Sequence, residues 1–175
     1  MLRIALSTLL IAVTPMFAHA ADTQGPSDAE IAHIVVTANA VDVDAGKLAQ
    51  KKTKDKEVKK FAHQMVVDHA AVNEQAAALA KKLGVTPQDN DTSKSLKKGG
   101  DENIAKLKTL KGKTFDQEYV KHEVAYHQAV LDALDKVLVP NAKNEELKAL
   151  LIKVRPAFVA HLDHAKHLEA KYESK

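Results

Sequence analysis

The stretch of sequence that decides the fold is Asp55–Leu83, DKEVKKFAHQMVVDHAAVNEQAAALAKKL. Its apolar residues recur every three or four positions, which is the spacing of one buried face of an α-helix. This apolar stripe consists of Val58, Phe61, Ala62, Met65, Val72, Ala76, Leu79 and Leu83. Gly84 and Pro87 follow, and both residue types are common just after a helix. The segment is therefore predicted to be one long amphipathic helix.

Three other stretches carry the same periodicity. The segment 27–51 opens with a capping box made by Ser27 and Glu30. The segments 114–140 and 144–168 each begin with a residue that can cap a helix, threonine in the first and asparagine in the second. Four amphipathic helices of similar length predict an all-α protein, a four-helix bundle.

The connections between these helices are unequal. The first and second helices are joined by a few residues, as are the third and fourth, so each pair must form an antiparallel hairpin. The segment 85–113 between the second and third is long and polar, contains Gly99-Gly100, and shows only one short helical piece near 101–110. It is long enough to travel back along the bundle. One long crossover between helices 2 and 3 is the ferritin-like connectivity.

Composition supports one helical domain. The chain has 175 residues, of which 45% are hydrophobic and only 4% aromatic, with no tryptophan. A β-sandwich or barrel needs more aromatic residues and more turns. The 26 basic residues nearly balance the 23 acidic ones, and Arg155 is the only arginine after residue 20. Nucleic-acid binders cluster basic residues with stacking aromatics, so we expect no nucleic-acid partner.

The first twenty residues are typical of a secretory signal peptide. Arg3 precedes an apolar run over 4–13, and Ala18-His19-Ala20 is a small-x-small cleavage site. The run is too short to span a bilayer. We therefore expect a signal peptide over 1–20, a single domain over 21–175, and a soluble periplasmic product with no integral membrane span. The absence of cysteine excludes disulfides and thiolate sites.

Five polar residues interrupt the apolar faces where the periodicity calls for apolar side chains: Asp42, His69, Glu123, His127 and His161. They come from all four helices. In the ferritin-like order they lie at similar heights, within about 10 Å along the bundle axis at 1.5 Å per residue. Metal sites in helical bundles are built from ligand side chains that point inward at the same position along the bundle axis. Imidazole and carboxylate without sulfur suit zinc, iron, manganese or copper(II).

Two interpretations of this cluster remain open. The residues could hold a divalent metal, or they could form a hydrogen-bonded network of histidines and carboxylates that only fixes the helix register. In the second case the protein would be a non-catalytic envelope or stress-related interaction module. An oxidative di-iron enzyme is disfavoured, because the Glu-x-x-His motif occurs once, at Glu30–His33, in the first turn of a helix with His33 facing outward. The sequence contains no catalytic triad, phosphate loop or zinc-protease motif that would predict an enzyme.

Four motifs at these positions resemble a known family. They are VKKFAHQMVVDH over 58–69, DVDAGKLA over 42–49, FDQEY over 115–119 leading to His127, and HLDHAKHL over 161–168. The chain resembles the exported bacterial ferritin-like domains of unknown function, often labelled predicted outer membrane or putative membrane proteins. Tyr126 departs from the acid often found before that histidine. The resemblance implies the bundle and export, and it transfers no activity.

Overall fold

The structure, a computed structural model, describes residues 25–173, and all the regular structure in this range is helical. The elements in chain order are α1 (Asp28–Lys52), α2 (Lys56–Leu83), α3 (Asp91–Thr109), α4 (Gly112–Ala133), the π-helical turn η1 (Leu134–Leu138), α5 (Val139–Asn141) and α6 (Glu145–Glu173). The all-α prediction is confirmed. The signal peptide predicted over 1–20 lies outside the described residues.

Most helix ends occur where the sequence predicted them, and interactions between neighbouring residues explain their positions. The backbone N–H of Ser27 donates to the Glu30 carboxylate at 2.8 Å, and the Glu30 N–H donates back to the Ser27 hydroxyl at 3.3 Å. Gly84 ends α2 with a left-handed φ of 65°, a conformation that costs a glycine little. Asn144 accepts hydrogen bonds from two backbone N–H groups at the start of α6. The third predicted helix start is wrong: α4 begins at Gly112, so Thr114 lies inside it.

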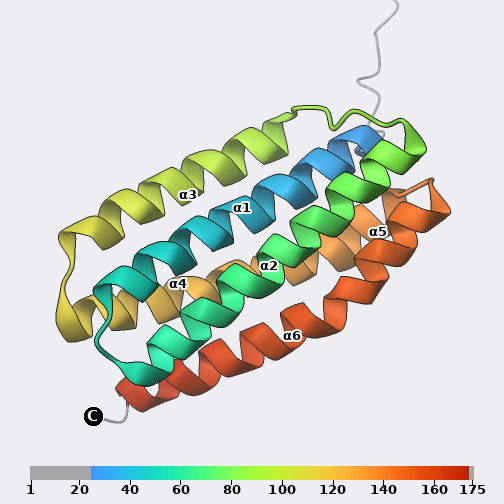
Figure 1. Cartoon of the computed structure of the whole chain (residues 1–175). Helices are drawn as coiled ribbons and strands as arrows, with labels where there is room; N and C mark the ends of the chain where they lie inside the picture. The colour runs from blue at the N-terminus through green and yellow to red at the C-terminus, as the bar shows by residue number, and fades with distance from the viewer. Residues whose placement is uncertain (1–24, 174–175) are drawn as a thin grey trace, which may run out of the picture.

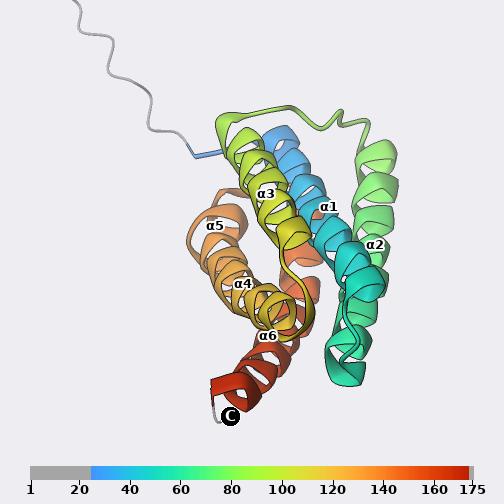
Figure 2. The same ribbon diagram turned by 90° about the vertical axis from the view of Figure 1, so that its left-hand side faces the viewer.

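Two helical hairpins, α1–α2 and α4–α6, make the body of the protein (Figure 1). Between α2 and α4 the chain forms α3, which lies along α1 (Figure 2). The expectation of one short helical piece near 101–110 is therefore wrong, since α3 has 19 residues and includes Gly99-Gly100. Asn90 and Ser93 form a capping box at its start. Gly100 then packs against Val41 of α1 so closely that a Cβ would lie 2.8 Å from the valine methyl groups.

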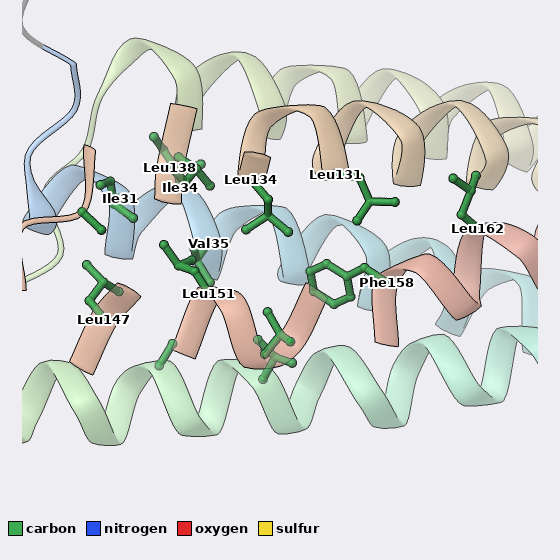
Figure 3. Close-up of a cluster of buried hydrophobic side chains, with 14 residues drawn as sticks. Ile31, Ile34, Val35, Leu131, Leu134, Leu138, Leu147, Leu151, Phe158 and Leu162 are labelled. Carbon is green, nitrogen blue, oxygen red and sulfur yellow. The ribbon is translucent and has the colours of Figure 1, made fainter. Parts of the chain in front are cut away.

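The buried hydrophobic residues form two separate clusters. One cluster includes Ile34, Val35, Val72, Leu131, Leu134, Leu151 and Phe158 (Figure 3). The other includes Ala45, Phe61, Met65, Phe115, Tyr119, Val120, Ala165 and Leu168. Along each of the four long helices the chain passes from one cluster to the other, and a buried polar residue lies at the boundary. The bundle therefore positions a polar layer between two apolar ones.

Among residues 25–173, none of the helices combines the length and the apolar character that crossing a membrane requires.

Candidate metal centre

The polar layer contains all five site residues that the sequence predicted. Asp42 comes from α1, His69 from α2, Glu123 and His127 from α4, and His161 from α6. Each is between 1% and 3% exposed. Helical periodicity explains this convergence, because each residue lies on the same face of its helix as the apolar residues before and after it.

The three histidines face one another across the bundle. Their ring centroids are 5.3 to 5.5 Å apart. One nitrogen from each ring lies within 4.8 Å of the other two. Phe158 closes one side of this group by stacking on His69, with ring centroids 4.9 Å apart. Ligand atoms around one tetrahedral ion at about 2.1 Å are roughly 3.4 Å apart, so small side-chain rotations would bring the nitrogens to a common centre.

The two carboxyl groups lie beside the histidines. An oxygen of Asp42 is 3.2 Å from Nε2 of His69 and 3.5 Å from Nε2 of His127. An oxygen of Glu123 is 3.5 Å from Nδ1 of His127. Asp42, Glu123 and His127 form a second group with metal-site spacing, which shares His127 with the three-histidine group. The arrangement thus offers nitrogen ligands on one side and oxygen ligands on the other.

Asn39 sets the tautomer of His69. The Asn39 amide nitrogen donates to the Val35 carbonyl at 2.8 Å, so its amide oxygen faces Nδ1 of His69, at 2.7 Å. That oxygen can only accept, so Nδ1 of His69 carries the proton and Nε2 presents a lone pair toward Asp42. Sequence reasoning missed Asn39, although it lies four residues after Val35 and three before Asp42, on the inward face of its helix.

The other two histidines are held in the same way. Nδ1 of His127 donates to the backbone carbonyl of Glu123 at 3.0 Å, which leaves its Nε2 as the lone-pair nitrogen. Nε2 of His161 donates to the carboxylate of Asp68 at 2.9 Å, which leaves its Nδ1 as the lone-pair nitrogen. Asp68 was also missed, because it is 40% exposed and its helical position points away from the apolar stripe.

The buried layer therefore holds an excess of electron pairs. Six of the described atoms that are buried without a hydrogen-bond partner belong to these five residues: both Asp42 oxygens, Oε2 of Glu123, Nε2 of His69, Nε2 of His127 and Nδ1 of His161. With the tautomers set as above, the three nitrogens are acceptors. Buried polar groups without partners cost free energy, typically about 1–3 kcal/mol each. The two groups with metal-site spacing show that a cation in the layer would be a partner for several of these atoms.

Burial also sets the protonation states of the site. It raises the pKa of Asp42 to about 8. Burial, and then the charge of Asp42, raises the pKa of Glu123 well above its usual range. Burial lowers the pKa of His127 to about 4, and it also lowers the pKa values of His69 and His161. At neutral pH the imidazoles are therefore neutral and able to ligate, whereas a metal would have to displace protons from the carboxyl groups.

The other five described histidines lie outside this layer, although His33, which the sequence predicted to face outward, is partly buried. His63 and His167 are exposed, and His33, His122 and His164 are partly buried at the edges. His164 packs its ring edge against Phe61. Among the described residues, none of these five belongs to a group with metal-site spacing.

Comparison with known proteins gives a family and two similar folds. A family model described as a domain of unknown function, DUF4142, matches residues 14–168. The crystal structure of a DUF305 fragment from Deinococcus radiodurans is similar with a TM-score of 0.70 and 12% identity, over 84% of this chain and 99% of that one. A structure described as CopM in the Cu(II)-bound form is similar with a TM-score of 0.63 and 17% identity, over 83% and 98%. No curated protein matches the chain. At these identities the structural matches show a shared helical fold.

Proposed function

The chain belongs to the DUF4142 family of domains of unknown function, and from that premise we propose that it binds one divalent transition-metal ion through His69, His127 and His161. Asp42 supplies a carboxylate ligand and Glu123 lies beside it on the oxygen-rich side. The observation that carries the proposal is the grouping of three buried imidazoles, with one nitrogen of each ring within 4.8 Å of the other two, and each ring has a nitrogen held by a hydrogen-bond acceptor. Histidines that ligate metals are usually oriented in this way.

Proton counting favours a metal over a purely structural network. Nε2 of His69 and Nε2 of His127 lie 3.2 and 3.5 Å from the same oxygen of Asp42. The single proton of the Asp42 carboxyl group can be donated to only one of them, so this carboxyl group leaves the other nitrogen without a donor. A buried acceptor in this state is costly. One bound cation removes the deficit.

The donor chemistry narrows the metal to zinc, iron, manganese or copper(II). Imidazole with carboxylate suits these ions, and the described site has no sulfur ligand. Copper(II) is the first to test, because it binds such sites most tightly among the first-row divalent ions. The similar bundle described in a Cu(II)-bound form supports the same choice.

The cellular setting of this function is part of the proposal. The predicted signal peptide over 1–20 supports export to the periplasm, and the return of the chain along α1 through α3 supports a ferritin-like classification of the bundle. The role we assign is metal binding without catalysis.

Titration of metal-free protein with copper(II), zinc, manganese and iron(II) tests the proposal. A ligand at one hundred times its Kd stabilises the native state by about 2.7 kcal/mol, so the melting temperature should rise with metal concentration. Calorimetry should give one ion per chain. His161→Ala should abolish the shift, whereas His63→Ala, which removes an exposed histidine from α2, should retain it. If none of the four metals shifts the melting of the wild type, the structural network is the correct interpretation.

A further inference from the structure

A cavity of about 490 Å³ lies beside the polar layer and reaches it at His69 and Asn39. Its walls come from α1, α3, α4, η1, α6 and one residue of α2. Most of the lining is apolar, including Ile34, Val35, Leu134, Leu138 and Phe158, which point into the same region in Figure 3. A volume of this size is within the range of about 300–1,000 Å³ that is typical of small-molecule sites.

Small residues form part of the cavity wall. Ala38 on α1 and Ala129 and Ala133 on α4 line the cavity, where larger side chains would fill it. The π-helical turn η1 forms another part of the wall through Leu134, Val137 and Leu138. Turns of π-helix are frequent at functional sites.

Two polar side chains that line the cavity, Asn39 and Tyr126, are already engaged. The amide of Asn39 bonds to His69 and to the Val35 carbonyl. The Tyr126 hydroxyl donates to the carbonyl of Ala38 at 2.9 Å. A polar ligand would therefore lose its water without gaining hydrogen bonds from these side chains, which costs free energy. These two side chains and the mostly apolar lining therefore favour an apolar ligand over a polar one.

The charged groups at the cavity select against anions. Glu30 and Asp91 line it, and the described lining residues include no lysine or arginine. Hydrogen bonds from Ser27 lower the pKa of Glu30, so this carboxylate is ionised at neutral pH. A carboxylate or sulfonate would meet negative charge and find no cation.

We propose that this cavity binds a neutral, apolar small molecule whose inner end lies against His69 and Phe158. This site goes beyond the metal proposal and does not need a metal to be bound. When both sites are filled, the two ligands share His69 as a neighbour. Each should then change the affinity of the other by the same factor.

Fluorescence titration with the neutral probe N-phenyl-1-naphthylamine, in metal-free protein, tests this site. The matched variants are Ala129→Phe, at an exposed position of α4 that lines the cavity, and Ala125→Phe, at an exposed position of the same helix outside it. Ala129→Phe should weaken probe binding by about tenfold, equivalent to about 1.4 kcal/mol, and Ala125→Phe should leave it unchanged. Decanol should displace the probe at lower concentration than decanoate.

A second variant and a folding check make the result decisive. Ala133→Leu fills the cavity from another position and should also weaken the probe, while melting curves confirm that each variant is folded. The proposal is overturned if the probe does not bind, if both cavity variants bind it as the wild type does, or if decanoate competes as well as decanol. Because the probe titration uses metal-free protein, a failure of metal binding would leave this result intact.

Discussion

The carboxylate of Asp68 on α2 accepts a hydrogen bond from Nε2 of His161 on α6 at 2.9 Å, across 93 residues of sequence. Asp68 is 40% exposed, whereas the side chain of His161 is 1% exposed. A half-exposed acid thus determines which nitrogen of a buried histidine is free. Carboxylates in this position orient metal-binding histidines and make them more basic.

Asp68→Ala should therefore weaken metal binding more than it weakens the fold. Loss of such an outer partner typically costs about 10–100-fold in metal affinity. Asp68→Asn retains an oxygen acceptor and should restore most of the affinity, which a merely structural role would not predict. Calorimetric titration of both variants measures the difference. Equal affinity in Asp68→Ala and wild type would show that Asp68 does not position His161.

Asn39→Ala should destabilise the metal-free protein. It leaves Nδ1–H of His69 buried without an acceptor, at a cost of about 1–3 kcal/mol. Asn73→Ala is a matched control on the same helix pair, because Asn73 makes only a 3.3 Å bond to the Val36 carbonyl and is partly exposed. Urea unfolding of both variants provides the measurement. A similar loss in the two would argue against a special role for Asn39.

The stability of the metal-free protein should fall as pH rises from about 6.5 to 8. The pKa of Asp42 is about 8 in the folded state and near 3.9 in the unfolded state, so over this range the folded state holds the extra proton. The free energy of unfolding then decreases by up to about 1.4 kcal/mol per pH unit for this group. Below pH 6.5 the lowered pKa values of His69 and His127 have the opposite effect. The unfolded state binds more protons on these histidines than the folded state, so they make the free energy of unfolding increase as pH rises. Asp42→Asn should make the free energy of unfolding less dependent on pH. An unchanged dependence would show that another group causes it.

Metal binding should release protons at neutral pH. The sequence alone suggests that affinity falls near pH 6.5, where free histidine is protonated. In the folded protein the pKa of His127 is about 4 and that of Asp42 about 8, so Asp42 is the group that competes with the metal. Affinity should rise by about tenfold per pH unit between 6.5 and 8. Calorimetry in buffers of different ionisation enthalpy counts the released protons, and Asp42→Asn should release fewer.

Two adjacent glycines in α3 should respond oppositely to alanine. A Cβ at Gly99 meets nothing within 4 Å, so Gly99→Ala should stabilise the helix by about 0.5–1 kcal/mol. A Cβ at Gly100 lies 2.8 Å from both Val41 methyl groups, and valine has little freedom to rotate away. Gly100→Ala should therefore push α3 off α1 and destabilise the protein. Chemical denaturation of the two variants tests this packing. Equal changes in the free energy of unfolding would contradict it.

The sequence was sufficient wherever the determining chemistry is local. The capping box of Ser27 and Glu30 and the terminating Gly84 involve residues within a few positions of one another, so they can be read directly. Helical periodicity placed Asp42, His69, Glu123, His127 and His161 inward for the same reason, since the direction of a side chain from a helix follows from its position in the turn. Local rules failed at Thr114, where a residue able to cap does not do so.

Only the tertiary structure showed which residues of other helices each inward residue contacts. Gly100 of α3 packs against Val41 of another helix, and the sequence of α3 has too few apolar residues to predict this burial. The free nitrogens of His69 and His161 depend on Asn39 and Asp68, which are 30 and 93 residues away. The apolar cavity likewise is lined by alanines from separate helices, Ala38 on α1 and Ala129 and Ala133 on α4. Such pairings depend on the rotation and separation of packed helices, which periodicity within a single helix does not determine.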